Sequence, residues 1–253
     1  MNILSAYKFQ IKSWLKGIFI FFSIITAMDL VGLMGNIIVK TVDADGNSVV
    51  TGQDAALVIF AFIAGIATFS EFFHMLTQNG ISRKTISLSK PLVALTVSAI
   101  LTLVNLLLMQ IFTLVTVGNN SINTVYSTEM LYHQYFSNVG SVAGIFTNLL
   151  WTFAFCAAAI TSGGLIAALT YRLPKYGKYL FWGGLWALFV IVLPIIGWLY
   201  TGGAIWMVLF DFIFFVTGVD SGNPFAMVIT CSVIFAVTSA LTWLLMRRMP
   251  VKK

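Results

Sequence analysis

Long apolar stretches constrain this sequence more than any other feature. Six of them reach about 20 residues or more, the length that a helix needs to cross a hydrocarbon core of about 30 Å. Charged residues make up only 9% of the chain, whereas a soluble domain carries about 25%. The sequence excludes a cytosolic enzyme, a secreted disulfide scaffold and a nucleic-acid-binding protein. It predicts an all-α, polytopic membrane protein with transmembrane helices at 17–39, 55–76, 92–117, 141–169, 180–199 and 224–246.

The basic residues predict how the chain is oriented in the membrane. All but one of the 14 Lys and Arg residues fall in four alternate segments, 1–16, 77–91, 170–179 and 247–253. The other connecting segments carry Lys40 and most of the acidic residues. Loops rich in Lys and Arg stay in the cytoplasm. We therefore expect a multi-pass cell-membrane protein with both termini in the cytoplasm and six crossings.

The first 16 residues have an amphipathic pattern. Lys8, Lys12 and Lys16 fall on one helical face, while Trp14 and other apolar residues fall on the opposite face. This pattern predicts an interfacial helix that lies along the inner leaflet and contacts membrane lipid. The alternative is a simple basic flank of the first span. Residues 17–253 then form a single six-span transmembrane domain.

The stretch before the last span is apolar but does not fit a seventh crossing. A seventh crossing would place the basic tail outside, and Asp211 near the centre of the stretch is costly in lipid. We expect residues 201–223 to form an extracellular hairpin, either re-entrant or interfacial. Irregular backbone at that depth is tolerated where protein or a cavity surrounds it.

No catalytic motif is present, so intrinsic enzymatic activity is not expected. His74 and His133 fall on opposite sides of the predicted membrane and cannot share a metal ion. The sequence lacks the GxxxxGK[ST] motif of nucleotide hydrolases. We therefore expect no catalytic residue, no metal and no cofactor in this chain. Asp29 and Asp211 are candidates for polar groups within the membrane or along a transport path, and each also has a purely structural interpretation.

Small residues within the spans indicate helix packing. The GxxxG pairs Gly140/Gly144 and Gly218/Gly222 permit close approach of two helices. Cys156 and Cys231 each lie inside an apolar stretch. We expect both cysteines to be small buried hydrophobes.

The segment 77–91 carries the most information about function. The second span runs into Gln78-Asn79-Gly80, a strong helix stop because Gly adopts the left-handed conformation readily. Ser82 can then cap a short basic helix that ends before Pro91. Such a helix, parallel to the membrane, could be pushed by a soluble motor protein. The alternative is an ordinary basic turn between two spans.

Glu71 followed by QNGISRKT resembles the end of the second span and the coupling loop of ABC-2-type permeases. These are the six-span transmembrane subunits of bacterial ATP-binding cassette exporters, and the likeness is to the small Gram-positive type. The resemblance implies that a separate ATPase subunit, present in two copies, binds ATP and Mg. It implies that Glu71 braces the base of the second span and that the N-terminal helix also contacts the ATPase. The implied coupling residues are Gln78, Asn79, Gly80, Ile81, Ser82, Arg83, Lys84 and Thr85.

The leading hypothesis is thus a permease subunit for ATP-driven export, paired with a second copy or a paralogue. The many Phe, Met and Leu residues favour a hydrophobic or amphipathic cargo, such as an antimicrobial or toxin-like peptide, a lipid or a drug. Peptide export or self-protection is the preferred form, because small members of the family commonly do this. Two alternatives are a non-transporting immunity or scaffold protein and an ion-coupled secondary transporter.

Overall fold

The computed structural model describes residues 3–35, 41–42, 48–50, 53–116, 122–124, 127–132, 135, 142–195, 197, 202–247 and 249. The described chain is predominantly helical, as predicted. The long helices are α1 (Ile3–Gly35), α2 (Gln53–Gln78), α3 (Arg83–Thr116), α5 (Val142–Arg172), α6 (Lys175–Ala187), α8 (Ala204–Thr217) and α9 (Pro224–Arg247). Shorter elements are α4 (Ser127–Leu131), the π-helix η1 (Leu188–Val192) and α7 (Leu193–Ile195).

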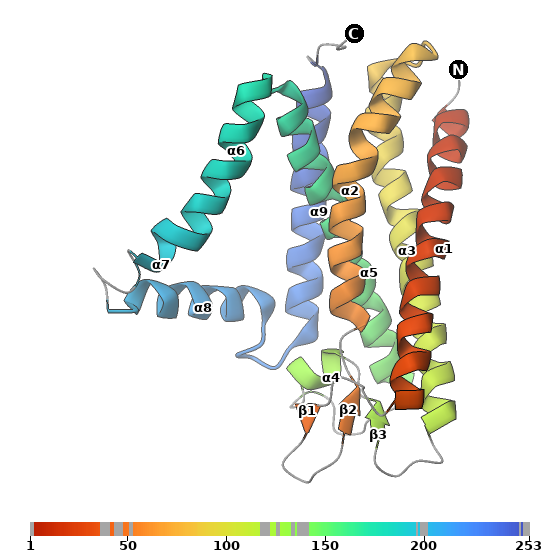
Figure 1. The fold of residues 1–253 in the computed structure, drawn as a ribbon, viewed down its shortest axis with the longest axis vertical. Helices are drawn as coiled ribbons and strands as arrows, with labels where there is room; N and C mark the ends of the chain where they lie inside the picture. The colour runs from red at the N-terminus through yellow and green to blue at the C-terminus, as the bar shows by residue number, and fades with distance from the viewer. Residues whose placement is uncertain are drawn as a thin grey trace.

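Six helical segments in the described part of the chain are long and apolar enough to cross a membrane. They are Ile3–Met28, Gln53–Gln78, Arg83–Ile111, Val142–Arg172, Tyr176–Ile195 and Pro224–Arg247. This confirms the predicted number of spans and a multi-pass membrane protein. Figure 1 shows that α1 begins and α9 ends at the same end of the bundle, as six crossings require. We call this end the terminal end.

Three short strands lie at the opposite end of the bundle, which we call the sheet end (Figure 1). They are β1 (Thr41–Val42), β2 (Ser48–Val50) and β3 (Ile122–Thr124). β1 pairs with β2 in antiparallel fashion and β2 with β3 in parallel. The sequence does not predict this sheet, because strands of two or three residues leave no periodic pattern.

The core of the bundle is built around α5, which contacts α2, α3 and α9. Its middle is rich in small buried residues, among them Ala157, Ala158, Ala159 and Gly163. Small side chains let neighbouring helix backbones approach closely, which is how helices associate in lipid. Cys156 and Cys231 are both buried free thiols, as predicted.

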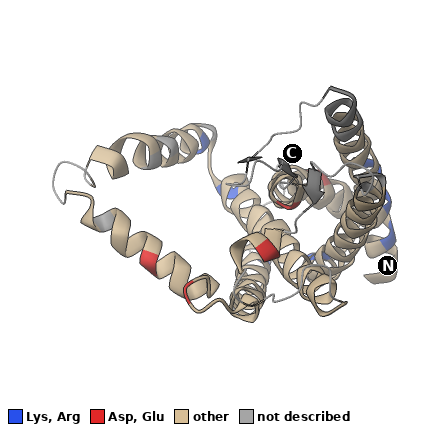
Figure 2. Ribbon diagram, turned by 90° about the horizontal axis from the view of Figure 1, so that it is seen from below, with Lys and Arg blue, Asp and Glu red and all other residues tan. Residues whose placement is uncertain are grey.

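The segment from α6 to α8 extends from one side of the bundle (Figures 1 and 2). α6 descends from the terminal end at a slant, and α8 returns crosswise towards α9 (Figure 1). Most α6 side chains are exposed, with Tyr176 86% and Leu180 79% exposed. The π-turn η1 ends two residues before Pro194, and a proline in a helix removes one backbone hydrogen bond.

The N-terminal segment differs from the predicted interfacial helix. α1 continues without a break through Gly17, so residues 3–16 and the first span form one helix. Trp14 is only 4% exposed and packs into the core of the bundle. Lys8, Lys12 and Lys16 are exposed on the other side of α1. One side of the apolar face therefore packs against protein, while Ile3, Leu4 and Leu15 stay exposed, so the predicted contact with lipid is not confirmed.

Candidate functional site

The connection between α2 and α3 is a hydrogen-bonded turn at the terminal end. Gly80 has φ +72°, and its amide donates to the carbonyl oxygen of Thr77 at 3.1 Å. The Ile81 amide donates to the Leu76 carbonyl at 3.0 Å, while both side chains are buried in the core. These two bonds and the apolar contact define a Schellman motif, which satisfies the last carbonyl groups of a helix. The predicted stop at Gly80 is confirmed.

Ser82 caps the next helix, as predicted. Its Oγ accepts a hydrogen bond from the Thr85 amide at 3.3 Å and lies 2.8 Å from the Thr85 hydroxyl oxygen. The predicted end of this helix before Pro91 is wrong, because α3 continues through Pro91 to Thr116. Buried residues on both sides of the proline, such as Ile86 and Val93, pack into the same core. Their packing outweighs the hydrogen bond that proline removes.

The tip of this turn is open to a partner. Gln78, Asn79, Gly80, Ser82, Arg83 and Lys84 are exposed, Thr85 is half-buried, and only Ile81 is buried. Glu71, two turns before the end of α2, is exposed. Its carboxylate forms no hydrogen bond or ion pair within the described residues. The turn therefore presents two adjacent positive charges, Arg83 and Lys84, on a fixed backbone.

A second feature is an apolar cavity of about 450 Å³ that is open to the surface of the bundle, in the half nearer the sheet end; Ile59 and Phe212 on its wall are largely exposed. Its walls come from α2, α5, α8 and α9 and are almost entirely apolar. Phe62, Phe155 and Phe212 are among the lining residues, and Cys231 lies at its wall. Pockets that bind small molecules typically measure about 300–1,000 Å³ and are mostly apolar. The cavity is therefore of a size and character to hold an apolar group.

The end of α8 is held in place beside this cavity. Gly218, with φ +73°, closes α8, and Thr230 on α9 donates to the Val216 carbonyl at 2.8 Å. The hydroxyl group of Tyr132 donates to the Thr217 carbonyl at 2.8 Å. Asn223 caps α9 by accepting from the Phe225 amide at 3.0 Å. These bonds fix the wall that α8 contributes.

The remaining predicted residues are not brought together. Asp211 is exposed on α8 and does not line the apolar cavity. Asp29 falls within α1, but its side chain lies outside the described part of the structure, as does His133. No group of three or more His, Cys, Asp or Glu residues that could hold a metal ion occurs among the described residues.

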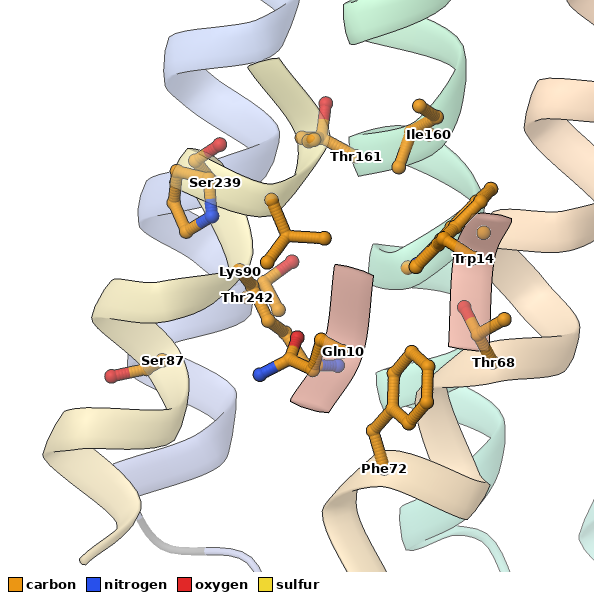
Figure 3. A pocket seen from close by; sticks show the side chains of 15 residues that line it. Gln10, Trp14, Thr68, Phe72, Ser87, Lys90, Ile160, Thr161, Ser239 and Thr242 are labelled. Carbon is orange, nitrogen blue, oxygen red and sulfur yellow. The ribbon is translucent and has the colours of Figure 1, made fainter. Parts of the chain in front are cut away.

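The sequence does not predict the surroundings of two charged residues, Asp54 and Lys90. Asp54, in the first turn of α2, is 6% exposed, and its Oδ1 accepts a hydrogen bond from Asn105 Nδ2 at 2.6 Å. The sequence predicts Lys90 at the end of a short basic helix at the membrane surface, but the continuous α3 places it on the wall of a small cavity between the helices (Figure 3). The signal for Lys90 was its spacing from Ser87 and Ala94, which places all three on one helical face.

Comparisons with known proteins give no further guidance, since no protein-family model, no curated protein and no solved structure matches this chain.

Proposed function

We propose that this chain is the transmembrane permease subunit of an ATP-binding cassette exporter of the ABC-2 type. The observation that carries the proposal is the turn from Gln78 to Lys84, which is exposed, basic and fixed by a Schellman motif and a serine cap. A rigid turn between two spans transmits the movement of a docked partner to both helices. The partner would be a soluble ATPase, in two copies, that binds ATP and Mg and supplies the energy that this chain has no motif to generate.

The apolar cavity supports a hydrophobic or amphipathic cargo. A cavity of about 450 Å³ with apolar walls suits an acyl chain, an apolar drug or the side chains of an amphipathic peptide. It would reject sugars and ions, because their polar groups would lose hydrogen bonds with water on entry. Peptide export, including protection against antimicrobial peptides, is the form that we favour.

The orientation and the second permease subunit belong to the same proposal. The terminal end would face the cytoplasm in the cell membrane, where the basic residues of the turn, of α1 and of Arg172 would lie. Lys8, Lys12 and Lys16 on the exposed side of α1 would face inner-leaflet phosphates or the ATPase. The exposed apolar surface of α6 would contact a second copy or a paralogue, and residues 201–223 would form the outer hairpin.

The first experiment is a mild-detergent pull-down of the tagged chain from its host, with identification of stoichiometric partners. We expect one ATPase per permease, and we expect Arg83→Glu to reduce its recovery at least tenfold. Arg172→Glu is the matched control, because Arg172 is an exposed basic residue at the same end but in the other connection. Gly80→Pro should abolish export and stimulated ATP hydrolysis, since proline cannot adopt φ +72°.

Other results would favour the alternatives. A folded oligomer without an ATPase would support an immunity or scaffold protein. Transport that survives depletion of ATP but collapses with the proton gradient would support an ion-coupled transporter.

A further inference from the structure

A hollow of about 480 Å³ lies between α5 and α9 near the terminal end and is open to the surface of the bundle. Arg172 and Arg247, the last residues of the two helices, line it at that end. The rest of its wall consists of five leucines, which are Leu165, Leu169, Leu241, Leu244 and Leu245. The hollow therefore combines an apolar wall with two guanidinium groups.

The spacing of residues along each helix produces this arrangement. Leu165, Leu169 and Arg172 follow the i, i+4, i+7 pattern, which places them on one face of α5. Leu244 and Arg247 are three residues apart, and so they share a face of α9. The two helices contact each other, and both end at the terminal end (Figure 1). Each helix therefore contributes leucines first and an arginine last.

The two arginines are not neutralised by the described part of the chain. Arg172 and Arg247 are both exposed, and neither side chain forms a hydrogen bond or an ion pair with a described residue. Neither α5 nor α9 contains Asp or Glu, and no described carboxylate lines the hollow. A guanidinium group carries five N–H donors in a fork that matches the oxygen atoms of a phosphate group. This end of the hollow is therefore complementary to an anion.

The depth of the hollow fits a lipid. α9 has 24 residues and is about 36 Å long, so each end of a centred helix extends about 3 Å beyond a hydrocarbon core of about 30 Å. Arg247 therefore lies within the headgroup layer, which is about 5–8 Å thick. Arg172 lines the same hollow from the end of α5. The leucines lie about 3–10 Å further down the helices, at the depth where acyl chains begin.

We propose that the hollow between α5 and α9 is a binding site for an anionic phospholipid. The phosphate group lies against Arg172 and Arg247, and one acyl chain lies along the leucines. A zwitterionic lipid fits less well, because it brings its own positive group next to the arginines. Basic pockets between transmembrane helices are known to hold anionic headgroups. The site does not depend on the transport proposal, since it requires only that α5 and α9 span a membrane.

The test uses native mass spectrometry of the full chain in detergent, with phosphatidylglycerol added. Arg172→Gln and Arg247→Gln should each weaken its binding about fivefold, and the double variant about 25-fold, because a basic residue near an anionic lipid contributes about this much. Arg83→Gln is the matched control and should bind as wild type, since Arg83 is an exposed arginine at the same end but outside the hollow. Wild-type affinity in the double variant, or an equal loss in Arg83→Gln, would overturn the proposal.

Leu169→Trp tests the apolar wall, because the larger side chain fills part of the hollow and leaves both arginines in place. It should weaken the binding of phosphatidylglycerol several-fold. The variant should fold, since Leu169 is 39% exposed. Leu180→Trp is the control, because Leu180 is an exposed leucine on α6 that does not line the hollow. Unchanged binding by Leu169→Trp would mean that no acyl chain lies along the leucines.

Inorganic phosphate separates a lipid site from a simple anion site. In nanodiscs of phosphatidylcholine, added phosphate should leave the melting temperature of the wild type unchanged. Inclusion of phosphatidylglycerol should raise it, and the double variant Arg172→Gln/Arg247→Gln should lose most of this rise. A saturable effect of phosphate that requires the two arginines would show that the site takes a free anion, and the lipid proposal would be wrong. If the double variant does not fold, Arg172→Lys/Arg247→Lys keeps both charges and should keep most of the rise; its loss would contradict the proposal.

Discussion

Gly65 on α2 and Gly163 on α5 each point at the backbone of the other helix. A Cβ atom on Gly65 would lie 2.5 Å from the Ile160 carbonyl oxygen, and a Cβ on Gly163 would collide with the Phe62 carbonyl oxygen. The absence of side chains at these two positions therefore sets the distance between α2 and α5. In lipid, where helices associate through close packing, this contact is central to the stability of the bundle.

Gly163→Ala should destabilise the protein, because a methyl group there meets backbone that cannot turn aside. Overpacking of this kind costs about 1–3 kcal/mol. Gly164→Ala is the matched control, since a Cβ at Gly164 has no atom within 4 Å. Thermal unfolding of both variants in the same detergent checks the prediction. Equal melting temperatures for the two variants would mean that α2 and α5 do not cross as described.

Gly80→Ala tests the turn between α2 and α3. At φ +72°, an L-residue is strained by about 1–2 kcal/mol, so the variant should lower the melting temperature. Gly17→Ala should raise it, because Gly17 lies within α1, has open space around it, and alanine favours helix by about 0.5–1 kcal/mol. The two substitutions should therefore change the melting temperature in opposite directions. A stabilising Gly80→Ala would contradict the Schellman motif.

The sequence predicted the features that depend on local composition. The six spans follow from apolar length alone, and the stop at Gly80 and the cap at Ser82 follow from residue types at adjacent positions. Helix contacts depend instead on how distant segments meet. The GxxxG pair Gly218/Gly222 lies in the turn after α8, with positive φ at both glycines, and Gly140 lies outside the described residues. The close crossing uses Gly65 and Gly163, which no spacing within one helix could reveal.

Contacts between distant segments also explain why two helices, α3 and the first part of α1, differ from their predictions. A proline predicts a helix end only when packing is weak, and α3 is packed on both sides of Pro91. The apolar face of residues 3–16 could rest on lipid or on protein. The hydrogen bond from Gln10 to Ser89, 79 positions later in the chain, shows that one side of this face rests on protein, while Leu4 and Leu15 on it stay exposed. Neither outcome can be read from a local pattern.

Asp54 and Asn105 should be energetically coupled. Both are buried, and their 2.6 Å hydrogen bond joins α2 to α3. Removal of either partner leaves a buried polar group unsatisfied, at a cost of about 1–3 kcal/mol. A double-mutant cycle with Asp54→Ala and Asn105→Ala should give a coupling energy of about 2 kcal/mol. Asp211→Ala, at an exposed acidic position, is the control and should change stability little. Strict additivity of the two alanine variants would show that the bond contributes nothing.

Tyr132 should make stability depend on alkaline pH. Its side chain is 1% exposed, and its hydroxyl group donates to the Thr217 carbonyl. Burial raises the pKa of this phenol above its ordinary value of about 10. The full contribution of Tyr132 to stability is present below that ordinary pKa. Above it the unfolded chain releases the proton first, so the contribution falls as pH rises through the folded-state pKa.

Tyr132→Phe isolates this effect from the other tyrosines. At neutral pH the variant should be less stable than wild type by about 1 kcal/mol, because the hydrogen bond to α8 is lost. The difference should shrink above about pH 10, where the wild type loses stability that phenylalanine cannot lose. Tyr176→Phe is the control, since Tyr176 is 86% exposed, and it should match wild type at neutral pH. If the difference in stability between wild type and Tyr132→Phe stays constant with pH, the Tyr132 hydroxyl is not buried at the end of α8.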